Sequence, residues 1–129
     1  MTFEITASYA AVLAVMMLIL WVHVTKYRAS TGISINHADD IDLATRIRRH
    51  GNFVEIVPMV LILMALSEAQ GTRPLFLHLA GGLLILGRAL HPIGLDPNNA
   101  GAPLRIIGNS AGLIALLICV VTILMARFA

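Results

Sequence analysis

Charged side chains are scarce in this sequence, which has 129 residues of which 12% are charged. An ordinary soluble domain is about one-quarter charged, whereas this chain is 58% hydrophobic with a mean hydropathy of +0.86. This composition excludes an ordinary soluble domain and indicates a membrane protein. The nine Lys and Arg residues are spread along the chain without forming a basic stripe, so we expect no nucleic-acid partner.

Cysteine is also nearly absent, and this excludes a disulfide within the chain. The single cysteine, Cys119, lies in an apolar run, where we interpret it as a small buried side chain rather than a reactive thiol. The five histidines have neither the spacing nor the cysteine neighbours of a zinc site, so we expect no metal. The sequence also contains no phosphate-binding loop and no serine-hydrolase turn.

Long apolar runs are what the sequence has in abundance. A helix needs roughly 20 apolar residues to cross a hydrocarbon core. Four segments approach this length: residues 6–25, 53–69, 75–90 and 106–126. The first segment lacks a small-residue cleavage site, so we interpret it as a retained span. Short connections make successive spans antiparallel neighbours, and we predict an all-α integral membrane protein with one domain over residues 1–129, an antiparallel bundle of four transmembrane helices.

Basic residues are distributed unevenly among the connections. Those in and beside the first connection are Lys26, Arg28, Arg46, Arg48 and Arg49. The third connection has Arg88 and Arg105 at its ends, whereas the second connection and the C-terminus contain only Arg73 and Arg127. The positive-inside bias therefore predicts that the first and third connections are cytoplasmic and that both termini lie on the opposite side.

The stretch RIRRHGNFVE, residues 46–55, places several charges directly before an apolar run. No strong helix breaker interrupts residues 40–70, and the preceding Asn and Asp residues can cap a helix, so we expect one helix across both segments. Such a helix measures about 45 Å and exceeds a hydrocarbon core of about 30 Å, so its first turns must lie outside the core. We expect Arg46 and Arg49 to pair with Asp42 on this helix.

Arg48, Asn52 and Glu55 share one face of that helix because they are spaced at i, i+4 and i+7. One interpretation is structural: Arg48 and Glu55 pair with neighbouring helices near the membrane interface. The other is a binding site for a small zwitterion, because a guanidinium binds a carboxylate and a carboxylate binds an ammonium group. Both interpretations stay open at the level of spacing.

A second group of polar residues flanks the third connection. Arg88 and His91 lie one turn apart at the end of the third span, and Arg105 lies at the start of the fourth. Singly, each arginine is typical of an interfacial anchor, and His91 could cap its helix. Gly108 and Gly112 form a GxxxG pattern that permits close helix contact within or between subunits. Four thin helices can hardly enclose a peptide-sized ligand, so we expect an oligomer with sites between subunits.

The pattern RRHGNFVEIVP resembles the second helix of the MAPEG family, the membrane-associated proteins in eicosanoid and glutathione metabolism. GRALH and APLRIIGNSAG are similar to the end of that family's third helix and the start of its fourth. The resemblance covers nearly the whole chain. It implies a homotrimer of four-helix subunits that holds glutathione at the subunit interface near the cytoplasmic side.

The resemblance also implies roles for particular residues. Five positions match the family's glutathione contacts: Arg28, Arg48, Asn52, Glu55 and His91. Arg105 matches the arginine that meets the glutathione sulfur, and this implies a catalytic role. A guanidinium that donates to a thiolate lowers the thiol pKa and raises the nucleophilic fraction. The implied reactions are conjugation of glutathione to a small hydrophobic electrophile delivered from the lipid bilayer, or reduction of a lipid hydroperoxide.

The sequence departs from the family's pattern at several positions. Asn109, one turn after Arg105, stands where several eicosanoid-forming members have a tyrosine, and residues 93–103 contain no tyrosine. These differences favour a generic or bacterial-type member in the bacterial inner membrane over a prostaglandin or leukotriene synthase. Two other functions stay open. One is a non-catalytic lipid-binding or activating membrane protein; the other is a small transporter or structural bundle in which Glu55 would bind a proton or cation.

Overall fold

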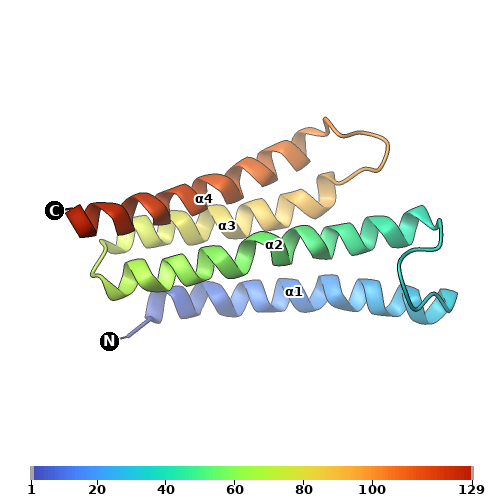
Figure 1. The fold of residues 1–129 in the computed structure, drawn as a ribbon, viewed down its shortest axis with the longest axis horizontal. Helices are drawn as coiled ribbons and strands as arrows, with labels where there is room; N and C mark the ends of the chain where they lie inside the picture. The colour runs from blue at the N-terminus through green and yellow to red at the C-terminus, as the bar shows by residue number, and fades with distance from the viewer. Residues whose placement is uncertain (1, 129) are drawn as a thin grey trace.

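The chain forms four long helices in the computed structural model, which describes residues 2–128. The helices are α1 (Glu4–Thr31), α2 (Ile41–Ala69), α3 (Pro74–Gly94) and α4 (Pro103–Phe128). They run alternately in opposite directions, with both termini and the α2–α3 turn at one end of the bundle (Figure 1). The α1–α2 and α3–α4 connections lie at the other end, which we call the connection end. Residues 2–128 contain no strand, so the all-α class is confirmed.

The helices extend beyond the apolar segments expected from the sequence. α1 continues past residue 25, and α2 begins at Ile41 rather than at residue 53. The expectation of one helix across the charged stretch and the following apolar run is therefore confirmed. All four helices are long and apolar enough to cross a membrane.

The α1–α2 connection is defined by local caps at both ends. α1 ends at Gly32, which adopts a left-handed conformation with φ of 71° and donates its N–H to Arg28 O at 2.9 Å. α2 begins after Asp40, whose carboxylate accepts a hydrogen bond from Leu43 N at 2.9 Å. This hydrogen bond, with a further one from the Tyr27 hydroxyl, holds the pKa of the Asp40 carboxyl below its usual range. The expected Asp cap is confirmed.

Helices α3 and α4 pack closely because glycines line their contact. A Cβ atom added at Gly87 would lie 2.6 Å from Gly108 O, and one added at Gly108 would lie 2.7 Å from His91 N. Both neighbours are backbone atoms, so a side chain at either position would push the helices apart. Gly108 therefore serves close helix contact within the subunit.

The bundle has a narrow apolar core and an apolar exterior. The core includes Leu13, Phe53, Val60, Met64, Leu84, Ala115 and Cys119. Cys119 is free and 1% exposed, which confirms its interpretation as a small buried side chain. Large apolar side chains also cover the outside: Val15, Ile62, Leu86 and Met125 are each more than half exposed. A surface of this kind matches a hydrocarbon solvent and not water.

Candidate functional site

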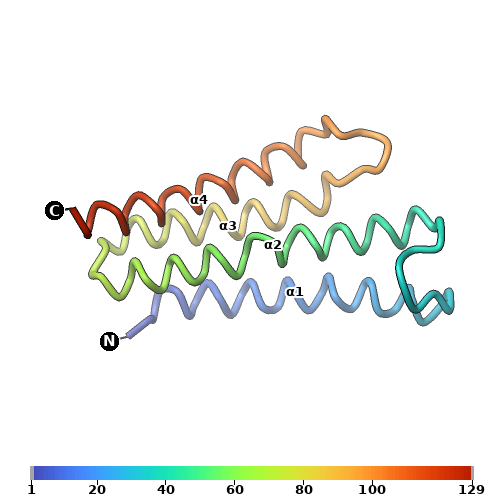
Figure 2. Tube along the Cα trace, viewed as in Figure 1, coloured from blue at the N-terminus to red at the C-terminus, as the bar shows by residue number. Residues whose placement is uncertain are grey.

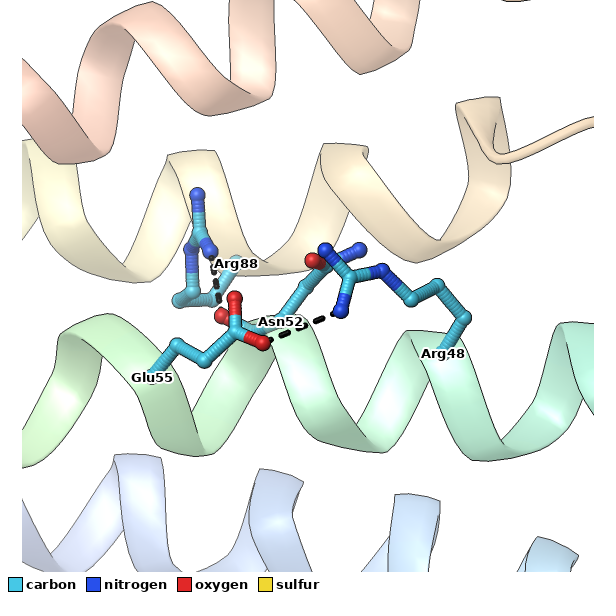
Figure 3. A network of polar contacts seen from close by, with 4 residues as sticks. All are labelled: Arg48, Asn52, Glu55 and Arg88. Atoms are coloured by element: carbon cyan, nitrogen blue, oxygen red, sulfur yellow. Dashed lines mark hydrogen bonds and ion pairs between the residues drawn. The ribbon is translucent and has the colours of Figure 1, made fainter. Parts of the chain in front are cut away.

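The polar column on α2 forms as its spacing predicts. Arg48 and Glu55 form an ion pair, with Arg48 Nη1 3.0 Å from Glu55 Oε1, and Asn52 lies between them on the same helix (Figure 3). The two charged side chains are 61% and 54% exposed. The structural interpretation expected each of them to pair with a neighbouring helix; instead they pair with each other. An exposed pair contributes only about 0–1 kcal/mol, so a ligand with opposite charges can replace it.

Arg88 lies directly behind this column and is the largest fully buried side chain, at 2% exposure. Its Nη1 donates to Asn52 O at 3.1 Å (Figure 3). Its Nη2 donates to Gly108 O at 3.0 Å. Gly112 leaves room for the guanidinium, because a Cβ atom there would lie 2.9 Å from Nη2. The interpretation of Arg88 as an interfacial anchor is therefore wrong. Its side chain turns inward because glycines on α4 leave space for it, and it connects α2, α3 and α4.

The start of α4 is packed against the end of α3. A Cβ atom added at Gly94 would collide with the backbone of Leu104 and Arg105, so only glycine permits this contact. Arg105 is half-buried in the first turn of α4, and its Nη1 donates to Ala100 O at 2.9 Å. His91, one turn before Gly94, is buried at 5% exposure. This packing brings Arg105 and His91 to the same end of the bundle as the α2 column.

These residues surround one hollow of about 420 Å³ among α2, α3 and α4, which we call the polar hollow. Its lining residues are Arg48, Asn52, Glu55, His91, Leu95, Ala100, Arg105, Ile106, Asn109 and Ser110. Five of the six residues singled out in the sequence thus border the same space. The lining contains two cations, Arg48 and Arg105, and one anion, Glu55. Asn52, Asn109 and Ser110 add neutral donors and acceptors.

Arg28 is the predicted site residue that does not line the polar hollow. It lies in the last turn of α1, where its Nη1 donates to Ile33 O at 3.0 Å. α1 and α4 lie at opposite edges of the bundle (Figure 2). Arg28 therefore lies apart from the polar hollow of its own chain, and its role as a site residue stays a prediction.

The expected pairing of Arg46 and Arg49 with Asp42 is wrong. Among residues 2–128 the only ion pair joins Arg48 and Glu55. The Arg46 guanidinium instead stacks on the Tyr27 ring, 4.5 Å from its centroid. Arg49 Nη2 donates to Leu95 O at 3.2 Å, at the C-terminus of α3. Asp42 is exposed, so it offers a weak ion pair. Packing against α1 gives Arg46 an aromatic ring, and packing against α3 gives Arg49 the negative end of a helix dipole.

Two features of the site were not predicted from the sequence. Ser110 lines the polar hollow, but no motif distinguished it from other small residues. The burial of the Arg88 side chain was also not predicted. Gly108 and Gly112 could have indicated it, because two small residues one turn apart leave space on α4 for a large side chain from a neighbouring helix. Within residues 2–128, no three His, Cys, Asp or Glu side chains come together as metal ligands do.

Comparison with known proteins matches the chain to one family and to one protein from two strains. The sequence profile of the MAPEG family matches residues 6–125. The inner membrane protein YecN of Escherichia coli K12, and the same protein of Escherichia coli O6:H1, are 29% identical to this chain over 90 residues. That alignment covers 70% of this chain and 69% of the relative. No solved structure matches the chain.

Proposed function

This chain belongs to the MAPEG family, and on that premise we propose that it is a membrane-bound, glutathione-dependent transferase or peroxidase. The family includes enzymes of both kinds. The observation that carries the proposal is the polar hollow, where Arg48, Asn52 and Glu55 of α2 meet Arg105 of α4. Its substrates would be hydrophobic electrophiles or lipid hydroperoxides.

The charges of the polar hollow suit glutathione, which has two carboxylates, an ammonium group and a thiol. Arg48 binds a carboxylate and Glu55 binds the ammonium group, so the ligand replaces the exposed pair between them (3.0 Å). Asn52 donates to and accepts from the peptide groups, and His91 adds a buried imidazole beside them. Arg88 holds the backbone of Asn52 and Gly108 in place behind these groups.

Arg105 is the proposed catalytic residue. Its guanidinium donates to Ala100 O in the free protein and would turn from this exposed carbonyl to the glutathione sulfur. The permanent positive charge stabilises the thiolate, and the thiol proton passes to solvent. In conjugation, the sulfur forms a bond to the electrophilic carbon; in a substitution the leaving group departs with its bonding electron pair, and in an addition the π bond of the electrophile breaks and its electron pair takes a proton from solvent. In peroxide reduction, two glutathione molecules supply the electrons, and the products are an alcohol, water and glutathione disulfide.

We place the protein in the bacterial inner membrane as a homotrimer, with the connection end in the cytoplasm. The inner-membrane location of the relative YecN supports the first part. The basic residues of the two connections support the orientation, because both connections lie at one end of the bundle (Figure 1). The trimer is supported by the family resemblance, which assigns Arg28 to the glutathione site although Arg28 lies apart from the polar hollow of its own chain.

The proposal is tested by titrating the purified protein in detergent with glutathione and following the ultraviolet absorbance of the thiolate. We expect a saturable thiolate signal that disappears in Arg105→Ala, with weaker binding in Glu55→Gln. Arg73→Ala, which removes a cation at the opposite end, is the matched control and should change neither. Binding without a thiolate would favour the non-catalytic, lipid-binding alternative, and absence of binding would contradict the glutathione proposal altogether.

A further inference from the structure

A second set of hollows runs along α1 where it faces α2 and α3. The hollow nearest the connection end has a volume of about 280 Å³ and shares His23 and Arg46 with the next one, of about 390 Å³. That second hollow shares Leu20 and Pro92 with a third, of about 180 Å³. The shared residues make the three hollows one continuous groove, which we call the α1 groove. None of its lining residues borders the polar hollow.

The α1 groove changes from basic to apolar along its length. Near the connection end it is lined by four groups that can carry positive charge: His23, Lys26, Arg46 and Arg49. Towards the middle of the bundle it is lined by Met16, Ile19 and Ala89. Arg88 also borders this part, but its guanidinium is bound to carbonyls inside the bundle. Lys26 and Met16 are separated by about 15 Å of helix, half of a hydrocarbon core of about 30 Å and therefore one leaflet.

No carboxylate among residues 2–128 forms an ion pair with the cations at the basic end of the α1 groove. The nearest candidate, Asp40, accepts hydrogen bonds from the Tyr27 hydroxyl and from Leu43 N, and forms no ion pair with Arg46 or Lys26. Arg46 lies over the Tyr27 ring, which leaves its nitrogens available. Arg49 has a buried Nε that lacks a hydrogen-bond partner. Cations without an ion-pair partner near the membrane surface attract an anion, such as a lipid headgroup.

We propose that the α1 groove binds one anionic phospholipid. The phosphate lies against Arg46, Lys26 and His23, and one acyl chain follows Leu20 towards Met16. Three observations carry this assignment: cations that form no ion pair, the apolar continuation of the same groove, and a length equal to one leaflet. The inference does not depend on the glutathione proposal, because the two sites share no lining residue.

The test is native mass spectrometry of the purified full-length protein in detergent. The protein is titrated with phosphatidylglycerol, with phosphatidylcholine of the same acyl chains, and with inorganic phosphate. The variants are Arg46→Gln and Lys26→Gln at the basic end, and Ala89→Phe, which fills the apolar end. Arg73→Gln is the control, since it removes the same charge at the opposite end of the bundle. Lys26 is exposed, so its variant should fold even if Arg46→Gln does not.

We expect one tightly held phosphatidylglycerol per chain, with weaker binding of phosphatidylcholine. Arg46→Gln and Lys26→Gln should each weaken binding about fivefold, Ala89→Phe should also weaken it, and Arg73→Gln should not. Equal binding of the two lipids, or unchanged binding in both basic-end variants, would overturn the proposal. Competition by inorganic phosphate at similar concentration would identify an ion site and not a lipid site. A changed subunit stoichiometry in Arg46→Gln without any lipid binding would identify the groove as an interface between copies, which also overturns the proposal.

Discussion

Arg88 is a buried cation in a membrane bundle and has no carboxylate partner. Its guanidinium is held by two backbone carbonyls, Asn52 O at 3.1 Å and Gly108 O at 3.0 Å. Both carbonyls belong to helices that carry residues of the polar hollow. Arg88 therefore positions Asn52 and the first turns of α4, although it does not line the polar hollow itself. Burying a charge costs desolvation free energy. The hydrogen bonds by which Arg88 connects three helices offset this cost.

We expect Arg88→Lys to destabilise the protein more than Arg88→Met. Lysine keeps the buried charge but cannot bridge two carbonyls on different helices, so the free energy of unfolding should fall by about 2–4 kcal/mol. Methionine has similar length and removes both the charge and its need for partners, so the loss should be smaller. Thermal unfolding followed by circular dichroism in detergent compares the two variants.

The reverse order, with Arg88→Met the less stable variant, would show that the two hydrogen bonds matter more than the cost of the buried charge. Glutathione binding is a second measurement on the same variants. If Arg88 positions the site, Arg88→Met should weaken glutathione binding even where its unfolding temperature is unchanged.

At the scale of elements, the contact between α3 and α4 decides where the polar residues of both helices lie. The contact depends on glycines, because backbone atoms of one helix occupy the positions of missing side chains on the other. α2 instead reaches the site by length: its first turns extend beyond its apolar run and carry Arg48 to the connection end. Helix packing and helix length therefore contribute separately to the polar hollow.

We expect Gly108→Ala to destabilise the bundle by about 1–3 kcal/mol, because the added Cβ would meet His91 N and Gly87 O, which cannot move without shifting α3. Gly82→Ala is the matched control. A Cβ at Gly82 meets nothing within 4 Å, so this variant should be neutral or stabilised by up to about 1 kcal/mol through helix propensity. Thermal unfolding in detergent measures both, and equal stability of the two variants would contradict the close α3–α4 contact.

At the scale of the whole molecule, one chain presents an open polar hollow and an apolar exterior, and Arg28 lies apart from the other predicted site residues. A homotrimer would bring Arg28 of one subunit to the polar hollow of the next, and would exclude water from the reacting sulfur. The same assembly would enclose the proposed tripeptide more fully than one small bundle does.

Subunit complementation tests this assembly. Arg28→Ala and Arg105→Ala should each lose most glutathione-dependent activity when expressed alone. Co-expression of the two variants should restore part of the activity, because some interfaces then combine an intact Arg28 with an intact Arg105 from different chains. Failure to recover activity, in complexes shown by mass spectrometry to contain both variants, would place both residues in sites within one subunit.

Much of the fold and part of the site could be predicted from the sequence. Apolar run length predicts the four helices, and the Asp cap sets the start of α2. Spacing at i, i+4 and i+7 places Arg48, Asn52 and Glu55 on one face, because helix geometry is local and regular. These features depend only on neighbours in the chain.

Only the tertiary structure decided which way the other arginines point. Arg88 turns inward to two carbonyls, Arg46 stacks on Tyr27, and Arg49 binds the end of α3. A long flexible side chain selects its partner from whatever groups packing brings within reach, and those groups come from distant parts of the sequence. The sequence therefore determined which helices form and which polar residues share a face. The packing of those helices determined which of the polar residues meet.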